Sequence, residues 1–271
     1  MLKERVITAV VLLVAFAAEL SFASVNVFTL VLGLIVGAAA WEWSRLCGVT
    51  HEHAQTGFAI AVGALTLISL YSPLVDSAVQ AVMLIGLLFW LCVPIQFYLK
   101  PILPKLQAVS IGWLLVGGLI LPIAALSMQF LRSYAPEASN GLLLYALSVV
   151  WVMDIGAYFS GRKFGKRKLA PLISPGKSWE GVYGGLACSF VLFVVVLVAG
   201  SWPEGTGFKL FIATLFAAAA SVLGDLFESR MKRAADMKDS SQLLPGHGGV
   251  LDRLDGVIAA LPVFAFFWVW M

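Results

Sequence analysis

The chain has 271 residues, of which 61% are hydrophobic and 12% are charged, and its net charge is +3. Soluble domains carry about twice that charged fraction, and a soluble chain of this composition would expose larger apolar patches than monomers tolerate. These values exclude soluble, disordered and nucleic-acid-binding classes and predict an integral membrane protein. Cys47, Cys92 and Cys188 show neither a pairing pattern nor metal-ligand spacing, which excludes a disulfide-rich scaffold.

Apolar stretches long enough to cross a bilayer recur along the whole chain. A transmembrane helix needs about 20 predominantly apolar residues, so we predict an all-α polytopic protein. The expected spans are 6–23, 25–46, 57–72, 78–99, 107–131, 141–160, 182–201, 208–228 and 253–271. We divide them into an N-terminal region of five spans (1–135) and a C-terminal region of four (136–271), which contains loops 161–181 and 228–253.

The basic residues predict the orientation of these spans, because cytoplasmic loops are enriched in Lys and Arg. With the N-terminus in the cytoplasm, 16 of the 18 Lys and Arg residues fall on the cytoplasmic side, and only Arg132 and Lys209 fall outside. We therefore predict a cytoplasmic N-terminus and an external C-terminus, and we expect any chemistry to take place at the cytoplasmic face, where the two basic loops lie. No cleavable signal is apparent after Met1–Arg5.

Insertion of a carboxylate within an apolar span costs about 2.5–3.5 kcal/mol, so we expect each such residue to have a structural or functional role. The acids in question are Glu19, Glu42, Asp154, Asp225, Glu228, Asp252 and Asp255. All but Glu19 fall toward the cytoplasmic ends of their spans, although only Lys and Arg were used to orient the chain. This convergence predicts that the acids act together.

Two of the helices place acids on one face. Asp225, Glu228 and Lys232 follow an i, i+3, i+7 spacing, and Asp252 and Asp255 follow i, i+3. Carboxylates at one depth make a site for a hard cation such as Mg²⁺, which also binds substrate phosphates. The alternative is a set of interfacial salt bridges, but the number of acids beside two basic loops favours a site.

Each cytoplasmic loop combines basic residues with a glycine-containing turn. In the second loop, Lys232, Arg233, Lys238 and Arg253 supply charge for phosphates, and the turn 245–249 precedes the last helix, whose N-terminal amides favour anions. The first loop has an alternative role as an anchor to anionic lipid. That role does not explain the turn Ser174–Ser178 or Glu180, and the first glycine of a Walker A motif is missing because that position is Pro171.

Glycines spaced four residues apart occur at Gly33 and Gly37 and at Gly181 and Gly185. Such pairs let two helices approach closely. The spacing alone leaves open whether the contact is within the chain or between subunits.

Three motifs in residues 150–256 resemble the CDP-diacylglycerol synthase (phosphatidate cytidylyltransferase) family. The first comprises Ser229, Lys232, Arg233, Lys238, Asp239, Pro245, His247, Gly248, Gly249, Asp252, Arg253 and Asp255. The second comprises Asp154, Ala157, Tyr158, Gly161, Arg162, Phe164, Gly165 and Lys166. The third comprises Ser174, Pro175, Lys177, Ser178, Glu180 and Gly181, with Ser178 at a position where threonine is more usual.

The resemblance implies transfer of CMP from CTP to phosphatidate, which gives CDP-diacylglycerol and pyrophosphate. It also implies a dimeric membrane protein that requires Mg²⁺, held by Asp225 and Asp252, and it leaves open whether a monovalent cation joins the Mg²⁺. The implied catalytic residues are Asp225, Lys238, Asp239, His247, Asp252 and Asp255. The implied substrate-binding residues are Asp154, Arg162, Lys166, Lys177, Ser178, Glu180, Ser229, Lys232, Arg233 and Arg253. Location in a bacterial inner membrane is a further expectation from the family.

Two other functions fit the sequence less well. The CDP-alcohol phosphotransferases need an Asp-Gly-x-x-Ala-Arg motif, but Asp255–Gly256 is followed by an uninterrupted apolar helix. A transporter with an acid relay would place acids near the bilayer midplane and show repeat symmetry. Here the acids collect near one face, and the sequence shows no internal repeat.

Overall fold

The computed structural model describes residues 2–134, 140–200 and 202–271, and among these the side chains of 2–9, 12–13 and 73–77 are outside the description. The described residues form nine helices and one short hairpin. In chain order these are α1 (Leu2–Phe22), α2 (Val25–Leu46), α3 (Glu52–Tyr71), α4 (Pro73–Leu99), α5 (Ile111–Ser133), α6 (Gly141–Phe164), β1 (Lys168–Ala170), β2 (Ser174–Ser178), α7 (Trp179–Ala199), α8 (Thr206–Ala234) and α9 (Leu251–Trp270).

The predicted all-α polytopic architecture is confirmed. Within the described part of the chain, eight helices, α2 to α9, are long and apolar enough to cross a membrane. The side chains of α1 are only partly described, so the ninth span stays a prediction. The predicted division between the two regions falls on residues 135–139, which lie outside the described residues.

Two local differences from the predicted spans lie beside the site. Helix α8 continues to Ala234, past the expected end at residue 228, because Glu228 and Lys232 pair along one helix face and are both buried. The expected turn at Ser174–Ser178 is instead strand β2, which pairs antiparallel with β1. Pro175 is compatible with this strand because a two-stranded hairpin leaves an outer edge on which no N–H group is needed.

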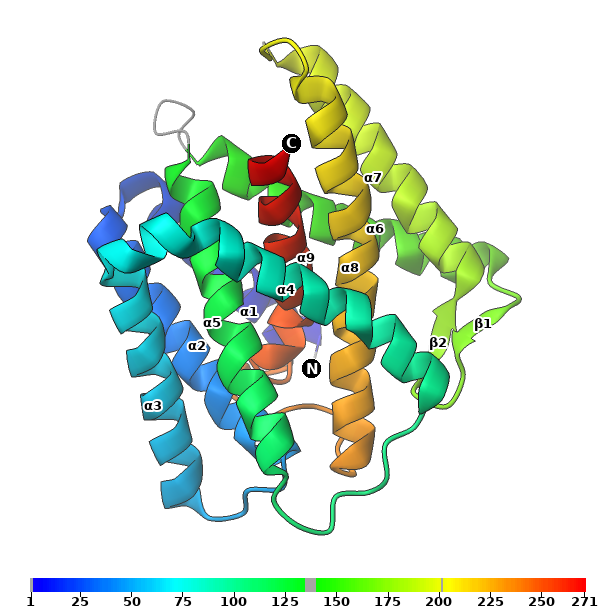
Figure 1. Cartoon of the computed structure of the whole chain (residues 1–271). Helices are drawn as coiled ribbons and strands as arrows, with labels where there is room; N and C mark the ends of the chain where they lie inside the picture. The colour runs from blue at the N-terminus through cyan, green and yellow to red at the C-terminus, as the bar shows by residue number, and fades with distance from the viewer. Residues whose placement is uncertain (1, 135–139, 201) are drawn as a thin grey trace.

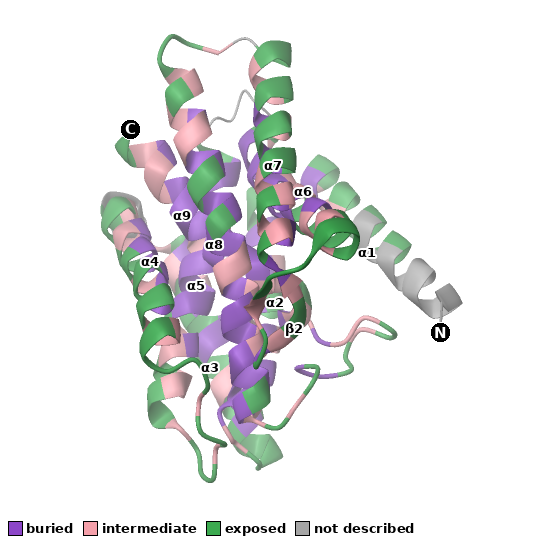
Figure 2. Cartoon of the chain, turned by 90° about the vertical axis from the view of Figure 1, so that its right-hand side faces the viewer, coloured by how far each residue is buried: buried purple, intermediate pink, exposed green. Residues whose placement is uncertain are grey.

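Helix α9 lies at the centre of the helical bundle (Figure 1). It packs along α8 and also contacts α4, α5 and α6, while α6 packs along α7 and α2 along α3. Both apolar core clusters include α9 side chains, among them Phe264 in one and Val263 in the other. Buried residues are accordingly concentrated on α8 and α9, whereas α7 and α4 present exposed faces (Figure 2).

The spaced glycines bring helices together within the chain. A Cβ atom on Gly63 of α3 would lie 3.3 Å from the carbonyl oxygen of Gly33 on α2. A Cβ atom on Gly181 of α7 would lie 2.9 Å from the carbonyl oxygen of Ala157 on α6. The interpretation as close helix packing is therefore confirmed for both pairs.

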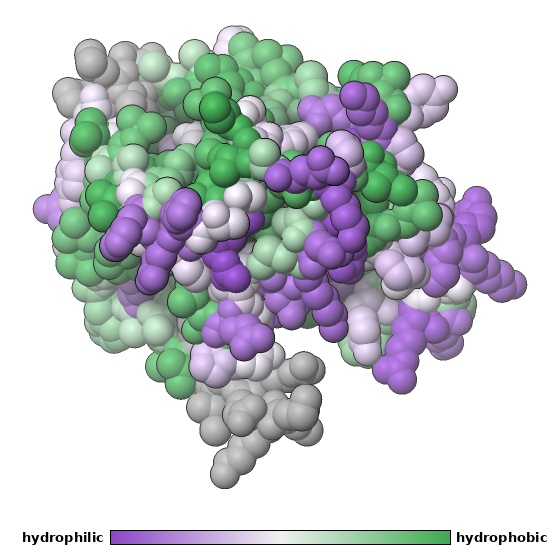
Figure 3. Space-filling model, turned by 90° about the horizontal axis from the view of Figure 1, so that it is seen from below, coloured by the Kyte–Doolittle hydropathy of each residue, from purple (hydrophilic) through white to green (hydrophobic). Residues whose placement is uncertain are grey.

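The segment between α8 and α9 folds back into the bundle. Helix α9 begins well inside the molecule, whereas α8 and α2 extend further toward the lower end in Figure 1. Ser240, Ser241 and Gly249 of this segment are buried. Seen from that end, hydrophilic side chains gather around the centre of the face, and apolar side chains surround them (Figure 3). This end of the molecule therefore carries the candidate polar site.

Two neighbouring glycines of α5 provide a test of the packing. A Cβ atom on Gly117 would lie 2.2 Å from the buried Trp43 ring, whereas one on Gly118 would meet nothing within 4 Å. We expect Gly117→Ala to destabilise the protein by about 1–3 kcal/mol because it overpacks the core. Gly118→Ala gains helix propensity and is expected to be neutral or stabilising. Thermal unfolding of both variants in detergent checks this, and equal midpoints would contradict the packing.

Candidate active site

The carboxylate of Glu42, on α2, accepts hydrogen bonds from the loop between α8 and α9. Its side chain is completely buried. One oxygen, Oε1, accepts hydrogen bonds from Ser241 Oγ at 2.5 Å and from the Val250 backbone N–H at 2.9 Å. The other, Oε2, accepts from the Leu251 backbone N–H at 2.6 Å and lies 3.0 Å from Ser240 Oγ. Glu42 therefore caps the N-terminus of α9 from a helix that is distant in sequence.

Asp252, in the first turn of α9, forms further hydrogen bonds with the loop between α8 and α9. Its Oδ2 atom accepts from the backbone N–H groups of Ser240 and Gly249, at 2.9 and 2.8 Å, and from Ser240 Oγ at 2.9 Å. The Ser240 hydroxyl therefore bridges the carboxylates of Asp252 and Glu42. These bonds leave Asp252 Oδ1 facing the ammonium group of Lys232, 2.6 Å away.

Lys232 joins α8 to α9 through two carboxylates. Its Nζ atom lies 2.6 Å from Glu228 Oε2, one turn earlier on α8, as well as 2.6 Å from Asp252 Oδ1. The side chain of Lys232 is 11% exposed, so water screens these ion pairs little. The predicted shared face of α8 is thus confirmed for Glu228 and Lys232.

An aromatic cluster around Phe227 fixes this part of α8. The Phe227 ring lies 5.6–6.0 Å, centroid to centroid, from the rings of four residues of α2, α4 and α5. These residues are Trp43, Phe89, Trp90 and Trp113. Because Phe227 is buried between Asp225 and Glu228 in sequence, its packing sets the direction in which both acids project.

A second group of charges surrounds Lys177 of β2. Its ammonium group forms an ion pair with Asp225 Oδ2 of α8, and Ser229 Oγ donates to Asp225 Oδ1 at 3.3 Å. Asp154 of α6 lies in electrostatic range of both Asp225 and Lys177, and Asp255 of α9 does so as well. Three carboxylates therefore lie near Lys177, and a further cation would offset the repulsion between them.

These acids line or adjoin a polar pocket of about 550 Å³ between α6, the hairpin, α7 and α8. Four of the predicted substrate-binding residues line it together with Asp225, and these are Asp154, Arg162, Lys177 and Ser178. The pocket volume lies within the range typical of small-molecule sites. The structure thus brings the second and third sequence motifs together around one cavity.

Glu180 and Ser178 shape the hairpin beside this pocket. The Glu180 carboxylate accepts from the backbone N–H groups of Lys166 and Arg167, at 3.0 and 3.1 Å, and from Arg167 Nε at 3.1 Å. The hydrogen bond to Glu180 and its negative charge raise the pKa of the Arg167 guanidinium above its usual value. Ser178 caps α7 by accepting from the Gly181 N–H group. The contacts of Glu180 and Ser178 therefore hold the β1–β2 hairpin segment against the start of α7.

The remaining predicted residues lie at the end of α8, at the start of α9 and in the loop between them. Arg233 donates to the carbonyl oxygens of Ile173 and Met237, at 3.3 Å each, and so ties the hairpin segment to the end of α8. Arg253 donates to the carbonyl oxygen of His247 at 2.6 and 3.0 Å. His247 is half-buried, whereas Lys238 and Asp239 are exposed at the loop surface.

The acids can contribute ligands for a divalent cation but do not form a complete cage. In the described part of the chain, no group of three His, Cys, Asp or Glu residues is placed to hold a metal ion. Mg²⁺ commonly takes one or two protein carboxylates together with substrate phosphates. Asp225 and Asp252 each direct an oxygen at a lysine ammonium group, so both carboxylates are already arranged to face a cation.

Glu42 is among the acids that the sequence places toward the cytoplasmic ends of the spans, but the sequence assigns it no catalytic, binding or metal-ligand role. The one feature of the sequence that points to Glu42 is the free-energy cost of placing a carboxylate within an apolar helix. Its partners Ser240 and Ser241 lie about 200 residues away in the sequence, and no local pattern joins them to Glu42. Only the fold shows that the segment between α8 and α9 supplies the hydrogen-bond donors for this carboxylate.

Removal of the Glu42 carboxylate should loosen the loop. We expect Glu42→Ala to destabilise the protein by about 3 kcal/mol or more, because it leaves several buried donors without an acceptor. Glu52→Ala, at the exposed start of α3, is the matched control. Thermal unfolding and protease cleavage within residues 235–250 report the effect. Equal behaviour of the two variants would show that Glu42 does not hold the loop.

Comparison with known proteins places this chain in a family. The sequence profile of the cytidylyltransferase family matches residues 3–271. A phosphatidate cytidylyltransferase of Pseudomonas aeruginosa is 41% identical, over 98% of this chain and 96% of the relative. The enzyme of the same name from Haemophilus influenzae is 36% identical, over 99% of each chain. That from Staphylococcus haemolyticus is 42% identical over 53% of this chain and 55% of its own length.

The family match covers nearly the whole chain, and the two relatives that align at full length share more than a third of its residues. The apolar helices agree with a membrane enzyme. The chain therefore belongs to the cytidylyltransferase family and is a nucleotidyltransferase.

Proposed function

We propose that this protein is a phosphatidate cytidylyltransferase, which makes CDP-diacylglycerol and pyrophosphate from CTP and phosphatidate. The observation that carries the proposal is the meeting of the second and third sequence motifs around one polar pocket, where Lys177 of the hairpin reaches Asp225 of α8. The first motif adjoins this pocket through Ser229, which donates to Asp225. The relatives that bear this enzyme name match over the same helices and loops.

The reaction needs no covalent enzyme intermediate, because phosphatidate itself is the nucleophile. An oxygen of its phosphate attacks the α-phosphorus of CTP, and the bond from that phosphorus to the oxygen bridging to the β-phosphorus breaks. The bridging oxygen leaves with the pyrophosphate. Catalysis of this kind depends on positioning the two substrates and on neutralising phosphate charge.

The basic residues at the pocket supply the neutralising charges. We assign Lys177 and Arg162 to the substrate phosphates, because both line the pocket and come from different elements. Lys232 stays paired with Glu228, which holds it beside Asp252. Lys238 lies on the loop that Glu42 binds, and Arg253 lies in the first turn of α9, where both can approach substrate phosphates.

Mg²⁺ is the proposed cofactor, with Asp225 and Asp252 as its protein ligands. Bound there, it would offset the negative charge of the triphosphate and favour departure of pyrophosphate. The carboxylate oxygens that now face Lys177 and Lys232 are the donors we assign to it. A second, monovalent cation and a homodimer stay predictions.

The proposed location is a bacterial inner membrane, with the polar pocket open to the cytoplasm. The excess of Lys and Arg on one side of the predicted spans supports this orientation. It would allow soluble CTP to enter from water while the lipid arrives from the bilayer.

The proposed activity is tested directly with purified protein in detergent. The protein is incubated with labelled CTP, phosphatidate and Mg²⁺, and the products are separated. Formation of a labelled liponucleotide with release of pyrophosphate supports the proposal. CTP hydrolysis without a lipid product, or no reaction at all, contradicts it.

Lys177 should be needed for turnover, unlike a nearby lysine of the same hairpin. We expect Lys177→Ala to lower kcat/KM by about 100-fold or more, because it removes a charge next to the reacting phosphates. Lys168→Ala, on the exposed strand β1, should change it by less than about threefold. If the hairpin only anchors the protein to anionic lipid, the two variants will behave alike in neutral detergent.

Asp225 provides a test of the cation assignment. We expect Asp225→Asn to insert and fold but to lose at least about 100-fold in turnover, even at saturating Mg²⁺. Asp236→Asn, which removes an exposed partner of Lys105, is the control and should remain active. Turnover is measured over a Mg²⁺ titration, and near-normal turnover of Asp225→Asn would remove Asp225 from the metal site.

A further inference from the structure

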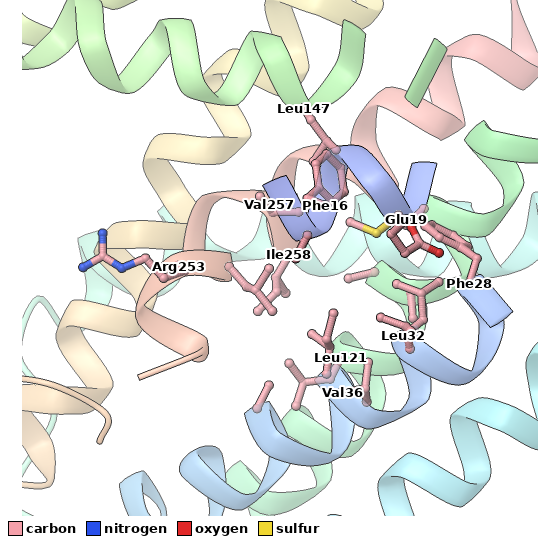
Figure 4. A pocket seen from close by; sticks show the side chains of 18 of the residues that line it. Phe16, Glu19, Phe28, Leu32, Val36, Leu121, Leu147, Arg253, Val257 and Ile258 are labelled. Carbon is pink, nitrogen blue, oxygen red and sulfur yellow. The ribbon is translucent and has the colours of Figure 1, made fainter. Parts of the chain in front are cut away.

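A second pocket, of about 490 Å³, lies between α1, α2, α5, α6 and α9 and is almost entirely apolar. Its lining includes Phe28, Val36, Leu121 and Ile258, and only two of its lining residues, Glu19 and Arg253, are charged. Figure 4 shows Arg253 at one end of this pocket and Glu19 with Phe28 at the other. The pocket is therefore an apolar chamber with a cationic group at one end.

We propose that this chamber holds one acyl chain of the phosphatidate substrate, with the lipid phosphate at the end marked by Arg253. The inference rests on the proposed function and adds to it a site for the lipid tail. A fixed guanidinium is complementary to a phosphate, and an apolar wall is complementary to a hydrocarbon chain.

Helix α6 connects the chamber with the polar pocket. Leu147 and Trp151 line the chamber, whereas Asp154 and Tyr158 line the polar pocket. The four residues follow spacings of four, three and four, so they lie along one face of α6. A lipid lying along this face would place its tail in the chamber and its headgroup toward Lys177 and Asp225.

The length of the chamber suits one leaflet of a bilayer. Its lining on α2 runs from Phe28 to Ala39, which corresponds to about 16 Å of helix. This is about half of the roughly 30 Å hydrocarbon core.

The chamber also has a lateral opening at Ile35 of α2 and Trp151 of α6. Ile35 and Trp151, which both line it, are 37% and 42% exposed. The chamber therefore opens between helices toward the surroundings, from which a lipid chain can enter without crossing water.

Arg132 closes the far end of the chamber. Its Nη1 atom lies 3.6 Å from Glu19 Oε1, and its guanidinium lies over the Phe28 ring, 4.2 Å from the ring centroid. Arg132 Nη2 also donates to the Ala23 carbonyl oxygen at 2.8 Å, which fixes the start of α2. A closed far end limits the length of the chain that fits.

The first experiment changes the size of the chamber. Ala125→Phe fills its wall from α5, and Ala64→Phe places the same ring on the exposed face of α3. We expect Ala125→Phe to lower the ratio of kcat/KM for dipalmitoyl over dioctanoyl phosphatidate by about tenfold or more, and Ala64→Phe to leave it unchanged. An unchanged ratio in folded Ala125→Phe would overturn the acyl-chain site.

The second experiment does not depend on turnover or on a variant that folds. The unaltered protein is labelled with phosphatidate that carries a diazirine at the end of an acyl chain, and the adducts are mapped by mass spectrometry. Adducts on Phe28, Leu32 or Met128 support the proposal, and adducts confined to outward residues such as Ile60 and Leu65 overturn it. Failure of the proposed function is a separate result, namely that neither lipid yields a liponucleotide.

Discussion

The site depends on one buried carboxylate. Glu42 accepts hydrogen bonds from both ends of the loop between α8 and α9 and has no exposed surface. Non-helical backbone inside an apolar bundle is tolerated only where its polar groups find partners within the protein. Glu42 and Asp252 supply those partners, so the loop can enter the bundle and bring Arg253 and His247 to the site. The cost of burying Glu42 is offset by the donors it satisfies.

Opposite charges alternate across the site. Lys177 links β2 to α8 through Asp225, and Lys232 links α8 to α9 through Asp252. Each lysine thus joins two elements of the fold. Asp225 and Asp252 in turn each direct one carboxylate oxygen at a lysine ammonium group. This arrangement keeps the acids close together without a bound ligand, because the lysines offset their repulsion. In the proposed complex, the substrate phosphates would bring new negative charge next to Lys177.

The two pockets match the two parts of the proposed lipid substrate, which is polar at its headgroup and apolar along its acyl chains. The polar pocket lies beside the hairpin, and the apolar chamber lies beside α1 and α2. Helix α6 contributes to both along one face, and its close packing on α7, at Gly156, Gly181 and Gly185, fixes that face relative to the hairpin. A substrate that uses both pockets would be held at its headgroup and its tail, which positions the reacting oxygen.

Sequence alone determined eight of the membrane-spanning helices and their approximate ends, and it located most of the acids that the fold brings together. Long apolar stretches permit only helices across a membrane, and scarce charges in such stretches are costly enough to mark a site. The spacing along α8 correctly placed Glu228 and Lys232 on one face, because that relation is local. The motifs around Lys177 and Asp252 likewise pointed to the region where the charges meet.

Only the tertiary structure decided which charges meet and what each one holds. Lys177 and Asp225 are 48 residues apart, and Glu42 and Leu251 are 209 apart, so no helical period relates them. The hairpin at Ser174–Ser178 depends on pairing with β1, and the apolar chamber depends on five helices packing around a common space. Periodicity defines the faces of a single element, whereas partners across elements are set by the packing of the whole bundle.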